Sequence, residues 1–198
     1  MCIRDSLSSA WFNDNTIVTV RYLDKISTYE NKQQLEFLKG LASVIDDFEE
    51  RVLTKVIVGK LMDLLKFNHL VASIIFIILD LLKRARLPQQ FFKQTIWPHL
   101  KAISQGKELT AQAIYILVHN MPLLDQQLDQ PEITAFIMPL YLKCFECPPK
   151  LKLLAINMLQ AVTKKVDYQY TKTRIIPKLV HVMKDLSLIH ISEPTRPY

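Results

Sequence analysis

The residues that could bind a metal ion or carry redox chemistry are few. Cys144 and Cys147 form a Cys-x-x-Cys pair, but no second pair of ligands follows, and a structural zinc site requires four. His181 is the nearest later histidine, and it has no partner at the spacing of metal ligands. We therefore expect no metal site and no cofactor, with Cys144 in a helix core and Cys147 at the end of that helix. The third cysteine, Cys2, lies in a terminal segment that we expect to be adaptor-derived. The two remaining thiols, reduced and without a disulfide framework, fit a cytoplasmic location.

Motifs that mark the common enzyme classes do not occur in the sequence. It contains no GxSxG, HExxH or P-loop sequence and none of the kinase catalytic loops. Outside the C-terminal segment that contains His190, the histidines are His69, His99, His119 and His181. They fall in different repeats, and His99 is expected at the surface or in a groove. The chain is therefore predicted to be non-catalytic, and we assign no catalytic residue.

Basic residues form groups that suit acidic partners. The formal net charge of +6 favours acidic surfaces without indicating nucleic acid. If the ends of successive helical hairpins align, these groups make a basic stripe suited to phospholipid headgroups, acidic peptides or RNA. The simpler interpretation is scattered solubilising lysines. The candidate interaction residues are Lys83, Arg84, Arg86, Lys164, Lys165, Lys172, Arg174 and Lys178, with Lys143, Lys150 and Lys152 as a further group.

The elements that must position these residues share a repeated pattern. Two or three apolar residues precede a helix breaker, and an apolar residue follows two places later. The breakers are Gly59, Pro98, Pro139 and Pro177, at spacings of 39, 41 and 38 residues. A period near 40 in an apolar, helix-prone chain is typical of stacked helical hairpins of the HEAT or armadillo kind. The sequence therefore predicts an all-α fold, an α-solenoid of such hairpins.

Each internal proline predicts a bend in a helix. A proline inside a helix removes one backbone hydrogen bond and costs about 3 kcal/mol or more. Three such prolines in register suggest a bend that each repeat uses to curve around its neighbour. The alternative is three independent helix starts, each with proline at its first position. In the partner helices, the spacing of Leu41, Leu79, Leu117 and Leu159 by 38, 38 and 42 residues predicts a matching register.

Apolar periodicity predicts the helices themselves. Gly40 is expected to let a neighbouring helix come close. Pro122 is expected to end a helix, and residues 123–129 after it are expected to form a linking turn. Residues 70–79 are the most apolar run but are far shorter than the ~20 residues of a membrane span, so we expect a buried helix there and no transmembrane segment. The expected helices are residues 16–27, 32–45, 49–66, 69–84, 89–105, 108–120, 132–147, 151–165 and 171–184.

Both ends of the sequence match translated sequencing-library adaptors. Residues 1–5, MCIRD, correspond to part of a transposase adaptor, and residues 186–196, LSLIHISEPTR, correspond to one reading frame of the complementary adaptor. We therefore expect residues 7–185 to be a HEAT-like repeat region from a longer protein. Residues 1–6 and 186–198 are expected to be adaptor-derived tails, and the natural protein is expected to extend in both directions.

Several short phrases occur in an informative order. They are FND at residues 12–14, YLD at 22–24, FLKGL at 37–41 and IWPHLK at 96–101. Their order and spacing resemble the helical region that follows the kinase-like domain of the Scy-one-like pseudokinases, closest to the second, coated-vesicle-associated type. The similarity covers about residues 11–185. Gly59, where the family tends to have proline, and the acidic residues 46–50 depart from the family pattern.

The resemblance implies a parent protein with a degenerate protein-kinase-like domain before these HEAT repeats. It implies a non-catalytic scaffold of clathrin-dependent vesicle traffic, cytoplasmic and peripheral to the Golgi, endosomes and coated vesicles. The implied partners are clathrin, adaptor or coat components, with an acidic membrane surface as a further partner. One fungal branch of the family binds tRNA and its export machinery. The alternative is therefore an RNA-binding solenoid linked to nuclear export, which would use the basic residues and tyrosines of residues 164–178.

Overall fold

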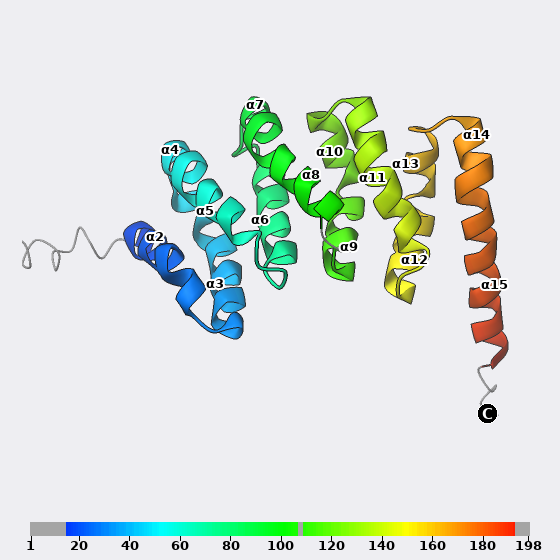
Figure 1. Ribbon diagram of the computed structural model, residues 1–198, viewed down its shortest axis with the longest axis horizontal. Helices are drawn as coiled ribbons and strands as arrows, with labels where there is room; N and C mark the ends of the chain where they lie inside the picture. The colour runs from blue at the N-terminus through cyan, green and yellow to red at the C-terminus, as the bar shows by residue number, and fades with distance from the viewer. Residues whose placement is uncertain (1–14, 107–108, 193–198) are drawn as a thin grey trace, which may run out of the picture. The chain divides into compact units, whose positions relative to one another are not determined.

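The structure is a computed structural model that describes residues 15–106 and 109–192, with side chains described for residues 16–104 and 109–184. These residues are all-helical and contain no strand, which confirms the predicted all-α class. The chain divides into two compact units, Met1–Gly106 and Lys107–Tyr198 (Figure 1). Each unit is described separately below. The expected tail of residues 1–6 and the last six residues of the second tail lie outside the described residues.

The first unit is built from consecutive helices that pack on one another. Helix α3 packs on α6, α5 also packs on α6, and α2 packs against the segment that joins α4 to α5 (Figure 1). The apolar run predicted at residues 70–79 forms most of α6, and nearly all of its side chains are buried. The helices are α2 (Asn15–Lys25), α3 (Asn31–Val44), α4 (Glu50–Val52), α5 (Val58–Leu64), α6 (Val71–Lys83), α7 (Gln89–Phe91) and α8 (Trp97–Gly106).

The second unit has a similar arrangement. Helix α9 packs against both α11 and α12, and α11 and α12 pack on each other as a hairpin (Figure 1). The short helix α10 lies against α9 and α11. The helices are α9 (Ala111–His119), α10 (Met121–Gln127), α11 (Gln130–Cys144), α12 (Pro149–Asn157), α13 (Leu159–Thr163), α14 (Tyr168–Tyr170) and α15 (Ile176–Ser192).

One isoleucine occupies the same position in all four repeated segments. Ile57, Ile96, Ile137 and Ile175 each lie two residues before a breaker, and each is 0% exposed. Burial of a side chain of this size stabilises the folded state by about 1.5–3 kcal/mol relative to leaving it exposed. The position two residues before each breaker therefore belongs to the core of both units.

A π-helical turn precedes three of the four breakers, Gly59, Pro98 and Pro177. The turns Leu53–Ile57, Phe92–Ile96 and Thr171–Ile175 each end two residues before a breaker. In each, the next N–H donates to the carbonyl five residues back instead of four. A π-turn of this kind inserts one extra residue into a helix. Because Gly59 follows such a turn although it is not proline, the turn does not require a proline ring.

The helices run through the breakers without a loop. In the segments around Gly59, Pro98 and Pro177 the α, π and α parts are contiguous, and Pro139 lies inside the single helix α11. This continuity favours the interpretation of prolines inside helices over the alternative of independent helix starts. Pro139 differs from the others because α11 accommodates it without a π-turn.

Gly59 and Gly40 lie in helices where a methyl group fits. A Cβ atom added at either position meets no atom within 4 Å, so the expectation that Gly40 admits a neighbouring helix is wrong. Gly59→Ala is expected to stabilise the chain by about 1 kcal/mol, because glycine is the more flexible residue in the unfolded chain. Thermal unfolding followed by circular dichroism should show a Tm higher by about 2–4 °C. Gly40→Ala should act in the same direction, and a fall in Tm for both variants would contradict the open space around them.

Two further expectations are wrong for local reasons. Residues 123–129 were expected to form a turn, but most of them lie in α10. Pro122 is in the first turn of that helix, where a missing N–H breaks no hydrogen bond, so it begins a helix instead of ending one. The helix expected at residues 151–165 is divided at Met158 into α12 and α13.

The division at Met158 changes the register of the last partner helix. Leu41, Leu79 and Leu117 are buried as predicted, but Leu159 is only partly buried. Ala155, which lies 38 residues after Leu117, is fully buried instead. The spacing of this buried position is therefore constant at 38 residues.

Helix α15 continues to Ser192, past the expected end of the repeat region at residue 185.

Candidate functional site

The first predicted basic group lies at the end of α6, where the chain turns sharply. The N–H of Arg86 donates to the carbonyl of Leu81 and that of Ala85 to the carbonyl of Leu82, which is the Schellman pattern of a helix end. Ala85 holds the left-handed position of this turn with φ 54°. Glycine is usual there because a Cβ atom crowds the following carbonyl.

The turn makes Ala85→Gly a stabilising substitution. We expect a gain of about 1 kcal/mol in the free energy of unfolding, because the left-handed conformation strains alanine and not glycine. Urea denaturation followed by circular dichroism measures this change. Ala102→Gly, at an exposed position inside α8, should act in the opposite direction by about the same amount. A loss of stability in both variants would contradict the left-handed assignment at Ala85.

Arg84 and Arg86 are engaged within the first unit. Arg84 forms ion pairs with Asp80, at 2.7 Å, and with Asp46. Arg86 donates to the backbone carbonyls of Asp46 and Phe48. These contacts connect the end of α6 to the turn that precedes α4, so the acidic residues there neutralise part of this basic group. In this group, only Lys83 has neither an ion pair nor a hydrogen bond from its side chain among the described residues.

Lys165 is also engaged with an acidic residue. Its Nζ lies 2.6 and 2.7 Å from the two carboxylate oxygens of Asp125, and both side chains are partly buried. The Nε2 atom of Gln130 donates to the carbonyl of Lys165 at 3.0 Å. These contacts connect the end of α13 to α10 and α11. Lys164, Lys172 and Arg174 are exposed, and no ion pair is recorded for them within the described ranges.

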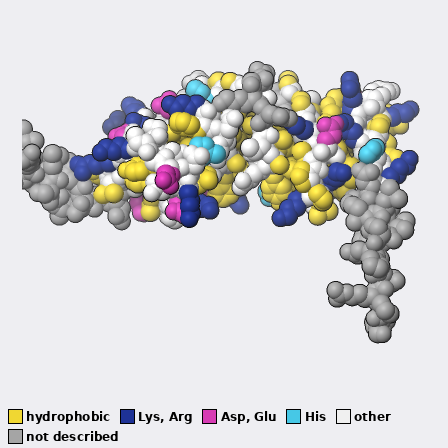
Figure 2. Space-filling view, turned by 60° about the horizontal axis from the view of Figure 1, so that its bottom comes forward, with side chains coloured by type: hydrophobic (Ala, Val, Ile, Leu, Met, Phe, Trp, Pro, Cys, Tyr) yellow, Lys and Arg dark blue, Asp and Glu magenta, His cyan; other side chains and the backbone are white. Residues whose placement is uncertain are grey.

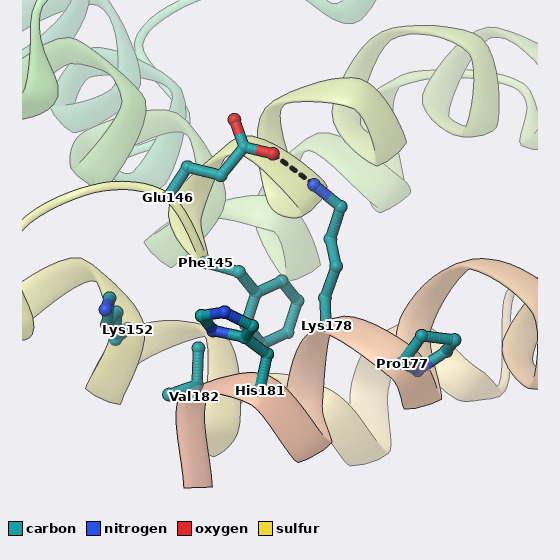
Figure 3. A pocket seen from close by; sticks show the side chains of 7 residues that line it. All are labelled: Phe145, Glu146, Lys152, Pro177, Lys178, His181 and Val182. Carbon is teal, nitrogen blue, oxygen red and sulfur yellow. Dashed lines mark hydrogen bonds and ion pairs between the residues drawn. The ribbon is translucent and has the colours of Figure 1, made fainter. Parts of the chain in front are cut away.

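A cleft in the second unit brings two of the basic groups together. It lies between α12, the turn before α12 and α15, has a volume of about 420 Å³, and is drawn in Figure 3. Lys152 comes from α12, while Lys178 and His181 come from α15 (Figure 3). Phe145 and Val182 supply apolar lining. This arrangement can bind an acidic group next to an apolar one.

Glu146 balances part of the positive charge in this cleft. Its carboxylate accepts a hydrogen bond from Lys178 (Figure 3). The hydrogen bond and charge of Lys178, with a smaller contribution from Lys143, lower the pKa of Glu146. Because the pKa of Glu146 is lower in the folded chain than in the unfolded chain, the pair stabilises the fold at any pH above the usual carboxyl pKa. This stabilisation is lost as the pH falls through the lowered pKa of the folded chain. Because the pair is exposed, the contribution is small.

The two cysteines of the Cys-x-x-Cys pair have different environments. Cys144 is fully buried in α11, and its Sγ donates to the carbonyl of Leu140 at 3.3 Å. Burial raises the pKa of the Cys144 thiol to about 12. Cys147 is partly exposed. Among the residues that the structure describes, no three metal-ligating side chains gather into a cluster.

The buried thiol of Cys144 should be nearly inert towards alkylating reagents. Only the thiolate reacts, and a pKa of about 12 leaves very little thiolate at pH 8. We expect iodoacetamide to modify Cys147 at least ~100-fold faster than Cys144 in the folded chain. Peptide mapping by mass spectrometry distinguishes the two sites, and unfolding in urea should make their rates similar. Comparable rates in the folded chain would show that Cys144 is not in the core.

The histidines lie in separate places, as predicted. His99 is exposed and lines a hollow in the first unit with Gly59 and Lys60. His69 is hydrogen-bonded to the buried Gln34, and His119 stacks on Tyr115 with the ring centroids 5.7 Å apart.

Within the described ranges, no helix has the length and apolarity that crossing a bilayer requires.

Sequence reasoning missed the acidic partners of the basic residues. Asp125 precedes Lys165 by 40 residues and Asp46 precedes Arg84 by 38. Both separations fall within the 38–41 residues between successive breakers, so the repeated pattern itself could have indicated them. Glu146 precedes Lys178 by 32 residues and carries no such signal.

The fold and its surface define the class of protein: packed helical hairpins with a mixed basic and apolar surface. Comparison with curated proteins finds relatives named as SCY1-like or as kinase-like. The chain is 24% identical over 172 residues to "SCY1-like protein 2" of Homo sapiens, covering 85% of this chain and 18% of that protein. It is 24% identical over 178 residues to "Protein kinase domain-containing protein ppk32" of Schizosaccharomyces pombe, covering 87% of this chain and 23% of that protein.

A further relative is "Protein kinase-like protein SCY1" of Saccharomyces cerevisiae, 26% identical over 144 residues, with 68% of this chain and 18% of that protein covered. The matches support membership of the SCY1-like family and confirm the resemblance noted from the sequence. The chain spans about a fifth of the length of these relatives. No family model matches the chain, and no solved structure matches it.

Proposed function

We propose that this chain is the HEAT- or armadillo-like part of a non-catalytic protein-interaction scaffold, from a kinase-like protein of clathrin and Golgi–endosome vesicle traffic. The observation that carries the proposal is the match to SCY1-like proteins over most of the chain. The two fungal relatives are named as kinase-like or as containing a kinase domain. We place the degenerate kinase-like domain in the part of the parent protein that lies outside this chain.

The constant spacing of buried positions supports a solenoid formed by residues 7–185, with residues 1–6 and 186–198 as adaptor-derived tails. The step from Leu79 to Leu117 is 38 residues, the same as the steps on either side of it. The first of these residues belongs to one unit and the second to the other. Each repeat of a solenoid contacts only its neighbours, and a regular step across the boundary between the units is what one continuous stack would give.

Coat and adaptor components are the partners that the family resemblance indicates, at the cytoplasmic face of Golgi, endosomal or coated-vesicle membranes. The test uses the purified chain immobilised on beads, with purified clathrin, adaptor and coat complexes passed over it. We expect at least one of these complexes to be retained above the level retained by the urea-unfolded chain. If none is retained, the traffic function is wrong.

RNA binding is the second candidate, and it is favoured by one exposed part of the second unit. Lys172 and Arg174 are exposed, Lys164 lies nearby in sequence, and Tyr168 is an exposed aromatic residue. Binding through such residues loses affinity steeply as salt rises, because counterions are released from the phosphates. Titration of labelled tRNA at several salt concentrations, with a Lys172→Ala, Arg174→Ala variant as control, distinguishes this candidate. A salt-independent affinity, or none, would exclude it.

A further inference from the structure

A groove on the second unit lies apart from the basic cleft of Figure 3. It has a volume of about 600 Å³ and lies between two helices that pack on each other, α9 and α12. This volume is in the range of about 300–1,000 Å³ that is usual for ligand sites in proteins. Its lining includes Ala111, Gln112 and Tyr115 from α9 and Lys150, Leu151 and Leu153 from α12.

Two large apolar side chains at this groove are exposed. Tyr115 is 40% exposed and Leu153 is 58% exposed, although α9 and α12 bury most of their other apolar residues. Phe76 on α6, at 52% exposed, precedes Tyr115 by 39 residues, and Leu153 follows Tyr115 by 38. The exposed apolar residue therefore recurs with the period of the core. Exposed apolar side chains that cluster at a hollow are typical of interaction sites.

The two helices that form the groove carry no acidic residue. They contain Lys150, Lys152 and His119. Lys150 is exposed, and within the described residues no ion pair is recorded for it. Pro148, which also lines the groove, precedes the first turn of α12, and this turn has neither a side-chain cap nor an acidic residue. The positive end of the α12 dipole adds to the charge of Lys150. Figure 2 shows hydrophobic, basic and acidic side chains interspersed on the face that it draws.

We propose that the groove between α9 and α12 binds a short peptide segment of a partner protein, in which a large apolar side chain lies next to an acidic residue. The apolar side chain packs between Tyr115 and Leu153, and the carboxylate faces Lys150. The proposal rests on the scaffold function and deepens it by naming the chemistry of one partner. The absence of acidic residues from both helices selects an acidic partner segment over a basic one.

Peptide selection from a random library tests the proposal directly. A phage library of random 12-residue peptides is panned against the full chain, and one enriched peptide is synthesised with a fluorescein label. We expect the enriched peptides to combine leucine, phenylalanine or another large apolar residue with an adjacent aspartate or glutamate. Fluorescence anisotropy then gives the Kd of the labelled peptide for the wild-type chain and its variants.

The variants are matched in pairs. Leu153→Ser should raise Kd by about tenfold or more, and Lys150→Glu should raise it by about fivefold or more. Val180→Ser and Lys172→Glu change an exposed apolar residue and an exposed basic residue of the same unit outside the groove lining, and they should leave Kd within about twofold. All four positions are exposed, so each variant should fold, which circular dichroism checks. Lack of enrichment, enriched peptides without acidic residues, or equal effects in both pairs would overturn the proposal.

The outcomes also separate this proposal from the proposed function. If clathrin, adaptor or coat complexes are retained equally by the wild-type chain and by Leu153→Ser, the scaffold function stands and the groove does not serve it. If the acidic peptide binds in the groove but none of these complexes is retained, the groove is a peptide site and the assignment to vesicle traffic is wrong.

Discussion

Ile137→Ala is expected to lower the free energy of unfolding of the second unit by about 2–5 kcal/mol. Ile137 is 0% exposed in α11, the helix that packs on both α9 and α12. The loss combines the transfer free energy of the removed carbon atoms with the cavity that they leave. Urea denaturation followed by circular dichroism measures the change as a lower midpoint at an unchanged slope.

Ile176→Ala is the matched control for this prediction. Ile176 is an isoleucine of the same unit and lies in a helix, but it is 43% exposed. Its replacement should change the free energy of unfolding by less than about 1 kcal/mol, because little apolar surface returns to water. Ile175, the neighbour of Ile176, is 0% exposed and should behave like Ile137. Equal losses at Ile175 and Ile176 would show that the assigned register is wrong.

Gln34→Ala is expected to destabilise the first unit by about 2–3 kcal/mol, since buried polar partners would lose their hydrogen bonds. Gln34 is a buried polar residue of α3, and both its amide nitrogen and its amide oxygen have partners. Its Nε2 donates to the carbonyl of Ile26 at 2.9 Å and to that of Tyr29 at 2.8 Å. Its Oε1 lies 2.7 Å from Nε2 of His69. One side chain thus connects the turn before α3 with the turn before α6.

A double-mutant cycle with His69→Ala separates the two halves of this network. The coupling between Gln34 and His69 should be about 0.5–1.5 kcal/mol, and the remainder of the loss belongs to the two carbonyls. Gln94→Ala, at an exposed glutamine of the same unit, is the control and should change stability by less than about 0.5 kcal/mol. A loss at Gln34 no larger than that at Gln94 would contradict the buried network.

The helical repeat was predictable from sequence because the apolar pattern recurs with a period near 40 residues. Ile57, Ile96, Ile137 and Ile175 stand in the same place of each repeated segment and are all buried, but the sequence pattern did not single them out from their apolar neighbours. The π-turns were not predictable in this way. They depend on which carbonyl each N–H reaches, and the turn before Gly59 forms without the proline that marks the others.

The surface was harder to predict because the relevant properties are not local. Lys165 and Lys172 are the same residue type, and only the fold places Asp125 beside the first of them. Tyr115 and Leu153 occur in apolar helices and look like core residues in the sequence, whereas both are exposed at a groove. A proline such as Pro122 can end the helix before it or begin the helix after it, and in the fold it lies in the first turn of α10.

Small-angle X-ray scattering of the chain tests most directly whether the repeated register continues through both units as one stack. A compact single globule of 198 residues would have a radius of gyration of about 16 Å. A solenoid predicts a value well above this, with the pair-distance distribution of one rigid, elongated particle. A radius of gyration near that of the globule, or a distribution with the separate maxima of two independently moving bodies, would contradict the account.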